Sequence, residues 1–185
     1  MKYKTSIKTW GILVIVAVLS TGCSYNIPKY GVSVDNVNNL KSIKTKINVG
    51  EFTAKEAGKN SITCRGAGGV GTPDKTPFDQ YIKNALISEL KLAGKFNENS
   101  KITISGHLDE VDFNSNIGTA NWIFKLNATS SNSKSIVVNT IYEYEGSFVA
   151  DKACSEVAQA FIPAVQKLIN DLVSHRDFNS FISSN

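Results

Sequence analysis

Residues 120–128 read Ala-Asn-Trp-Ile-Phe-Lys-Leu-Asn-Ala, and every second side chain from Ala120 onward is apolar. Successive side chains of a strand point to opposite faces, so this period of two predicts a strand with one buried face. The same alternation occurs before this stretch, in residues 102–108, and after it, in residues 136–144. Three such strands in succession, with a polar turn at residues 130–135, predict an antiparallel meander.

Two longer segments repeat apolar residues at helical spacing. The first follows Pro77, which suits the first position of a helix, and ends before Gly94, a natural stop. The second covers residues 152–174, and Pro163 inside it should kink or split the helix. The two apolar stripes consist of Phe78, Ile82, Ala85, Leu86, Leu90 and Ala93, and of Val157, Phe161, Ala164, Val165, Leu168, Ile169, Leu172 and Val173.

Two short strands, at residues 46–52 and 61–64, are expected before the first helix, which gives the order β-β-α-β-β-β-α. Each helix has one apolar stripe, so both can pack on the same face of one sheet. The fold class that follows is α+β: a two-layer sandwich with a mostly antiparallel sheet and two helices on one face. Residues 45–185 are expected to form this single domain, because the chain has only 185 residues.

The N-terminus has the pattern of a secretory signal peptide. Lys2, Lys4 and Lys8 precede an apolar run of ten residues, from Trp10 to Leu19. A bilayer-spanning helix needs about 20 apolar residues, so this run is too short for a membrane anchor. We therefore expect residues 1–22 to be cleaved; the alternative is a short buried helix.

Ser20-Thr-Gly-Cys23 resembles the lipobox of bacterial lipoproteins, although this motif usually has Leu where Ser20 stands. The resemblance implies that Cys23 becomes the acylated first residue of the mature chain; the alternative is an ordinary signal peptide that happens to end at a cysteine. By the same resemblance, Ser24 in place of Asp points to the periplasmic face of the outer membrane. Residues 23–44 are polar and irregular and are expected to form a lipidated tether.

Composition excludes several classes of protein. The chain is 42% hydrophobic and 19% charged, with 13 Gly, 4 Pro and 3 Cys, which fits neither a disordered chain nor a collagen or disulfide-knot protein. The net charge of +4 belongs mostly to the signal. Without its three lysines, 17 of the 20 basic residues remain against 16 acidic ones, so nucleic-acid binding is not expected.

The remaining cysteines, Cys64 and Cys154, are expected to form a disulfide, because they are an even pair in an exported domain. The alternative is two separately buried thiols. Neither cysteine belongs to a C-x-x-C pair, which argues against a thiol oxidoreductase. No metal site is expected, since His107 and His175 are far apart and no ligand spacing is present.

Residues 65–76 form a Gly-rich loop whose Gly66-x-Gly68-x-x-Gly71 matches the dinucleotide fingerprint literally. The helix that follows starts too late and the later strands form hairpins, so we expect no nucleotide or other cofactor. A flexible loop that contacts a protein partner is the preferred interpretation, and Arg65 can anchor it by donating to carbonyl groups. The candidate partner-binding residues are Arg65, Gly66, Gly68, Gly69, Gly71 and Lys75.

Two other clusters have a structural and a functional interpretation. Asp109, Glu110 and Asp112 lie where the strand pattern changes phase, which indicates a bulge. Paired carboxylates can serve hydrolysis or calcium binding, but a solvated strand end is the simpler interpretation. Aromatic residues could line a ligand groove, although their alternation places them on the face covered by helices; they are Trp122, Phe124, Tyr142 and Tyr144.

Two blocks of sequence carry a family resemblance. The first contains Cys64-Arg65-Gly66-Ala67-Gly68 and Phe78-x-x-Tyr81-Ile82-x-x-Ala85-Leu86-x-x-Glu89-Leu90, and the second contains Cys154 and Ala160-Phe161-Ile162-Pro163-Ala164-Val165-Gln166. Together they resemble a family of uncharacterised proteobacterial lipoproteins. The resemblance implies this class and adds no catalytic residue. More loosely, the order of elements is similar to that of small envelope-assembly lipoproteins, such as curli-secretion components and activators of penicillin-binding proteins.

The expected function is that of a non-enzymatic, membrane-anchored lipoprotein that binds a protein partner in cell-envelope assembly or maintenance. A periplasmic binding module for a lipid, glycan or peptide ligand is the alternative. A hydrolase that uses Asp109 and Asp112 is a third and weaker hypothesis.

Overall fold

A computed structural model describes residues 23–183 of the chain. The strands are β1 (Cys23–Asn26), β2 (Asn48–Ala54), β3 (Ser61–Cys64), β4 (Gly68–Gly71), β5 (Thr103–Asn114), β6 (Gly118–Ser130) and β7 (Ser135–Gly146). The helices are α1 (Val34–Ser42), α2 (Phe78–Leu92), α3 (Ala150–Val173) and α4 (Phe178–Phe181), with a 3-10 turn at Pro73–Lys75.

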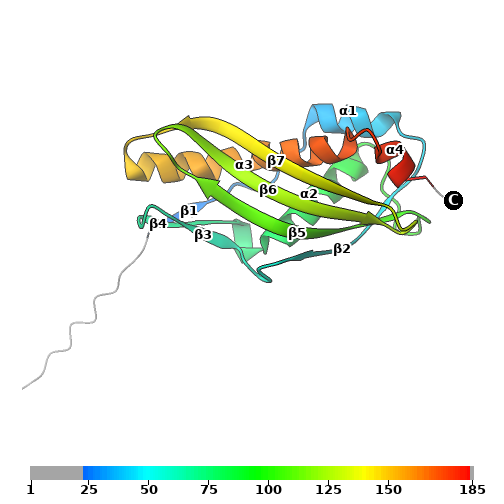
Figure 1. Ribbon diagram of the computed structural model, residues 1–185, viewed down its shortest axis with the longest axis horizontal. Helices are drawn as coiled ribbons and strands as arrows, with labels where there is room; N and C mark the ends of the chain where they lie inside the picture. The colour runs from blue at the N-terminus through cyan, green and yellow to red at the C-terminus, as the bar shows by residue number, and fades with distance from the viewer. Residues whose placement is uncertain (1–22, 184–185) are drawn as a thin grey trace, which may run out of the picture.

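The larger sheet has the order β2-β5-β6-β7, and β5, β6 and β7 form the predicted antiparallel meander. Helices α2 and α3 lie behind this sheet in Figure 1. The fold is therefore α+β, as predicted. The single predicted sheet is instead two sheets, because β1, β4 and β3 form a smaller one at one end, and β2 pairs with β5 in parallel.

Aromatic side chains fill the space between the sheet and the helices. Trp122 of β6 lies 4.7 Å from Phe161 of α3 and 6.4 Å from Phe78 of α2, measured between ring centroids. Its indole Nε1 donates to the carbonyl of Val157 at 2.9 Å, so its polar atom is satisfied although the residue is fully buried. Trp122 and Phe124 are thus part of the core, and both helices pack on one face.

The long C-terminal helix is not split at Pro163. α3 continues from Ala150 to Val173 with Pro163 inside it. A proline removes one backbone donor and crowds the preceding turn, which costs about 3 kcal/mol in a helix interior. The apolar stripe continues on both sides of Pro163, and its burial, for example of Phe161 and Leu168, keeps the two halves in one helix.

The expected tether is wrong for residues 23–44, because this segment joins the folded domain. β1 pairs with β4 from Cys23 opposite Gly68 onward, and α1 packs on α2 and α3. Ile27, Val37 and Leu40 belong to the same hydrophobic core as the later helices. The asparagines that suggest a loop by composition are helical here, and one of them, Asn36, is itself buried together with Val37 and Leu40. The predicted signal peptide, residues 1–22, lies outside the described residues.

The Gly-rich segment is also ordered. Arg65 and Gly66 have φ values of 47° and 68°, and the Ala67 N–H donates to the Cys64 carbonyl at 2.8 Å, which makes a tight turn between β3 and β4. Gly69 allows close strand contact, because a Cβ there would lie 2.6 Å from Ser61 Oγ. The flexible loop predicted for this segment is therefore wrong over β4.

Candidate functional site

The predicted disulfide is present at one end of the molecule. Cys64 of β3 and Cys154 of α3 are joined with an S–S distance of 2.07 Å and a Cα–Cα distance of 5.8 Å. Both residues are fully buried. The bond connects the smaller sheet to the N-terminal part of α3.

Arg65 follows the disulfide directly and connects three segments at this end. Its guanidinium donates from Nε to Ser115 Oγ at 3.1 Å, from Nη1 to the Phe148 carbonyl at 3.2 Å, and from Nη2 to the Ser115 carbonyl. The prediction that Arg65 anchors its surroundings through carbonyl groups is confirmed. We call this region the disulfide end: the start of β1, the turn at residues 65–66, and residues 115–117 and 147–149.

The other candidate residues of the Gly-rich segment have separate positions. Gly66 lies in the hairpin turn, and Gly68, Gly69 and Gly71 lie in β4 between β1 and β3. Lys75 is exposed in the 3-10 turn that follows, with a φ of 53°. The glycines thus have backbone roles, and the charged groups of this segment are carried by its two ends.

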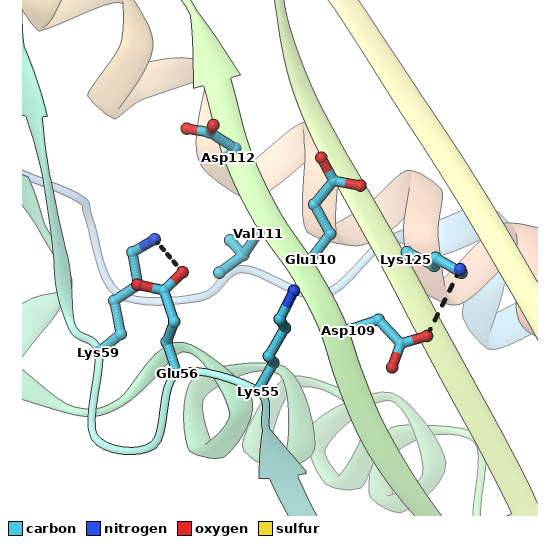
Figure 2. A pocket seen from close by; sticks show the side chains of 8 residues that line it. All are labelled: Lys55, Glu56, Lys59, Asp109, Glu110, Val111, Asp112 and Lys125. Carbon is cyan, nitrogen blue, oxygen red and sulfur yellow. Dashed lines mark hydrogen bonds and ion pairs between the residues drawn. The ribbon is translucent and has the colours of Figure 1, made fainter.

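A charged cavity of about 900 Å³ lies on the outer face of the larger sheet. The acidic cluster of β5 forms one side of it, and the segment after β2 forms the other (Figure 2). The lining residues are Lys55, Glu56, Lys59, Asp109, Glu110, Val111, Asp112 and Lys125. The predicted bulge is confirmed, since the β5–β6 register shifts between Leu108 and Glu110 and leaves Asp109 as the additional residue.

Ion pairs link some of these charges. Lys125 Nζ lies 3.8 Å from Asp109 Oδ2, and Lys59 Nζ lies 2.7 Å from Glu56 Oε1 (Figure 2). His107 Nε2 lies 3.6 Å from Asp109 Oδ1 on the exposed face. Within residues 23–183, no group of three or more His, Cys, Asp or Glu side chains is arranged to hold a metal ion. The cavity presents both ammonium and carboxylate groups, which suits a ligand that carries both charges.

Glu89 of α2 is a buried carboxylate that the sequence analysis did not single out. Its Oε1 accepts from the Tyr30 hydroxyl at 2.6 Å and from the Ser33 N–H at 2.8 Å, so it holds the segment that enters α1. Burial and the Glu89 charge raise the pKa of Tyr30 far above its usual value, which keeps this phenol a donor. The sequence could have indicated that Glu89 is buried, because it falls within the apolar stripe of α2, three residues after Leu86 and four after Ala85.

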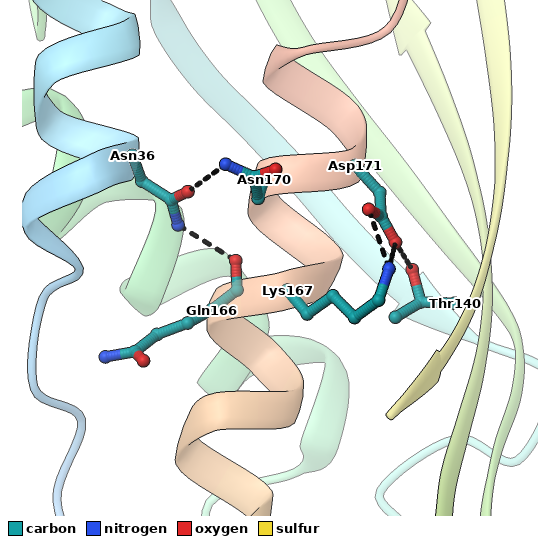
Figure 3. A network of polar contacts seen from close by, with 6 residues as sticks. All are labelled: Asn36, Thr140, Gln166, Lys167, Asn170 and Asp171. Carbon is teal, nitrogen blue, oxygen red and sulfur yellow. Dashed lines mark hydrogen bonds and ion pairs between the residues drawn. The ribbon is translucent and has the colours of Figure 1, made fainter. Parts of the chain in front are cut away.

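A second polar network holds α1 and β7 against α3 (Figure 3). The Asn36 side chain donates to the Gln166 carbonyl at 2.9 Å and accepts from Asn170 Nδ2 at 3.0 Å. Asp171 accepts from Thr140 Oγ1 at 2.7 Å. These bonds satisfy side chains between elements of the fold, so their role is structural.

The two tyrosines grouped with the core aromatic residues are only half-buried. Tyr142 and Tyr144 lie on the inner face of β7 but toward the disulfide end, where the helix layer begins. Burial, and secondarily the Glu156 charge, raise the pKa of the Tyr144 phenol. The groove interpretation therefore does not apply to Trp122 and Phe124, which are core.

In the part of the chain from Cys23 to Ser183, no helix is long and apolar enough to span a bilayer.

Solved structures that are similar to this chain include an uncharacterized protein and a hypothetical protein. No family model and no curated protein matches the chain. A crystal structure of an uncharacterized protein shares 11% identity, covering 80% of this chain and 95% of its own, with a TM-score of 0.44. The hypothetical protein CT253 from Chlamydia trachomatis shares 8% identity, covering 77% of this chain and 99% of its own, also with a TM-score of 0.44.

Proposed function

We propose that this chain is a bacterial lipoprotein, held on the periplasmic face of the outer membrane by acyl chains on Cys23. Its domain binds a protein partner in assembly or maintenance of the cell envelope. The anchor rests on the basic start, the short apolar run and the small residues before Cys23. One acyl chain binds a membrane only marginally, whereas the two or more of a lipoprotein anchor stably.

The disulfide supports an exported location. Disulfides persist in the periplasm and are rare in a reducing cytosol. Cys64 and Cys154 form this bond, and both are fully buried. The non-enzymatic role is the one expected from the sequence. It depends on whether the domain binds a protein partner.

The observation that carries the partner-binding part of the proposal is the edge strand β7. β7 is twelve residues long and pairs with β6, while no strand pairs with its other edge within the described residues. Val137 and Ile141 are 48% and 55% exposed on its outer face. A long edge strand with exposed apolar side chains is a surface on which an extended segment of another protein can add a strand.

The anchor is tested by metabolic labelling with palmitate. The full chain should incorporate the label and fractionate with outer membranes, whereas Cys23→Ala should remain unlabelled. A chain that carries no acyl group at Cys23, or that is found uncleaved in the cytosol, would refute the anchor.

The partner is tested by photocrosslinking in cells from Ile141, with the exposed Leu92 of α2 as a matched control. We expect one reproducible protein adduct from position 141 that is absent from position 92. A parallel series from Lys75 tests the Gly-rich segment. If none of these positions gives a reproducible adduct, the partner-binding function is wrong.

The charged cavity favours the second candidate function, a periplasmic binding module. Its mixed lysines and carboxylates suit a charged peptide or glycan, while an acyl chain would need an apolar cavity. Titration of a zwitterionic peptide library against the domain tests this function, with Lys125→Ala as the variant that should weaken binding. Equal binding by the protein and this variant would exclude the cavity as the ligand site.

A further inference from the structure

The disulfide end carries exposed apolar side chains at the same end of the molecule as Cys23. We propose that this end lies on a lipid bilayer, with Phe148, Val149 and Ile117 inserted among the lipid headgroups and the upper part of the acyl chains. The inference rests on the proposed function, because an acylated Cys23 supplies the bilayer. It adds a fixed orientation of the domain to that anchor.

The backbone connections place these groups together. Cys23 pairs with Gly68 in β4, and Gly68 pairs with Cys64 in β3. Arg65, the next residue, donates to the Phe148 carbonyl and to Ser115. Figure 1 accordingly shows the start of β1, the β5–β6 connection and the start of α3 at the same end of the molecule.

The apolar side chains at this end are unusually exposed. Phe148 is 80% exposed, Ile117 is 64% exposed and Val149 is 58% exposed. Phe148 is the only aromatic residue among the exposed large apolar residues of the described chain. Single exposed apolar side chains are ordinary, but three at one end, on two neighbouring connections, form a patch that marks an interaction surface.

Because no tether separates Cys23 from the domain, we infer that the surface which covers this patch is the bilayer itself. A tether formed by the 21 residues that follow Cys23, residues 24–44, could extend about 70 Å and leave the domain free of the membrane. Cys23 instead belongs to β1, so an acyl group on Cys23 would begin within the folded domain. The patch and the anchor would then face the same bilayer without an intervening linker.

The chemistry of the patch also suits a lipid surface. Aromatic side chains are favoured at the membrane interface, and cationic side chains are attracted to anionic headgroups. Arg65 is exposed beside Phe148 and forms no ion pair within residues 23–183. Its fixed guanidinium therefore provides a positive charge at the level where headgroup phosphates would lie.

The test uses the acylated protein, produced from the full chain and reconstituted into vesicles of phosphatidylethanolamine and phosphatidylglycerol with brominated acyl chains. Bromine quenches an indole only at short range, so Phe148→Trp reports contact with lipid at that position. Val137→Trp is the matched control: Val137 is also exposed but lies nine residues along β7 from Gly146, roughly 30 Å away. The indole of Trp122 is buried and provides a constant background in both variants.

We expect brominated lipid to reduce the additional emission of Phe148→Trp by about twofold and to leave that of Val137→Trp unchanged. Vesicle flotation and the mass of the acylated Cys23 peptide are measured on the same samples. If the protein floats with acylated Cys23 but position 148 is not quenched, the proposed orientation of the domain is wrong, while the acyl anchor at Cys23 is supported. Shielding of position 148 that increases with protein density would mean that a second copy covers the patch, which overturns the inference. A protein without acyl chains overturns both proposals.

Discussion

At the scale of single residues, polar groups in the interior fix the position of the N-terminal segment. Glu89 is fully buried and forms no ion pair within residues 23–183, and its carboxylate accepts from the Tyr30 hydroxyl and the Ser33 N–H. Charge near a helix N-terminus is favourable when it is negative, and Ser33 is the N-cap of α1. One carboxylate therefore joins α2 to the start of α1.

Removal of this carboxylate should destabilise the domain. In Glu89→Ala the Tyr30 hydroxyl and the Ser33 N–H lose their acceptor, and each orphaned donor costs about 1–3 kcal/mol. Asn36 Nδ2 also loses a contact to Glu89 Oε1 but keeps its bond to the Gln166 carbonyl. Glu89→Gln retains one acceptor oxygen and should cost less. Urea unfolding of the two variants measures the difference, and equal losses in both would contradict the role of Glu89 as an acceptor.

Tyr81 predicts how the stability depends on pH. Its hydroxyl donates to the Pro28 carbonyl at 3.0 Å, and burial raises the pKa of this phenol above its usual value. The neutral phenol is favoured in the folded state, so its contribution is complete below the unfolded pKa of about 10 and is lost as the pH rises above that value. The loss is at most about 1.4 kcal/mol per pH unit for one group.

The comparison is with Tyr81→Phe, which cannot ionise at this position. At pH 8 the protein should be more stable than this variant, because the variant lacks the bond to Pro28. Between pH 10 and 11.5 the difference in unfolding free energy should shrink. A difference that is independent of pH over this interval would show that Tyr81 ionises equally in the folded and unfolded states.

At the scale of elements, periodicity predicted those parts of the fold in which one face is buried. The alternation in residues 120–128 became the centre of β6, and the change of phase near Asp109 became the bulge of β5. Composition misled where a segment is polar overall. Three asparagines and three apolar residues in α1 favour an irregular segment by composition, although Val37 and Leu40 are buried.

The candidate sites were predictable only in part, because local patterns in the sequence do not show which distant segments meet in the fold. The disulfide followed from compartment and cysteine count, and the acidic cluster was visible as consecutive residues. Lys55 and Lys59 line the same cavity as that cluster because of where the segment after β2 lies in space, which no local pattern encodes. The inclusion of Cys23 in β1 likewise depends on a distant contact, its pairing with Gly68, which lies 45 residues later in the chain.

Pro163 offers a prediction about α3. The helix is maintained through this residue by buried side chains on both sides, at a local cost that an alanine would remove. Pro163→Ala should therefore raise the free energy of unfolding, by at most about 3 kcal/mol. Thermal unfolding measures the change, with Gln159→Ala on the exposed side of the same helix as the control. A loss of stability would show that the proline ring itself packs to advantage.

At the scale of the whole molecule, the disulfide connects the smaller sheet, through Cys64 of β3, to the helical layer, through Cys154 of α3. No strand pairing joins the smaller sheet to the larger one within residues 23–183. It closes a loop with a sequence separation of 90, which contains α2 and the β5–β6–β7 meander. The smaller sheet carries Cys23 at its edge, so the same bond ties the proposed anchor to the helical layer. The loop-entropy account of such a crosslink gives roughly 4–5 kcal/mol of stability.

Reduction should therefore lower the midpoint of urea unfolding of the entire domain, and not only loosen the disulfide end. The reason is that the crosslink limits the unfolded chain, in which Cys64 and Cys154 would otherwise separate. The variant with both Cys64→Ser and Cys154→Ser should unfold at the same reduced midpoint with or without reductant, which controls for effects of the reductant itself. If the reduced protein kept the midpoint of the oxidised one, the bond would be dispensable for the stability of the domain. Its role would then be limited to the local structure of the disulfide end.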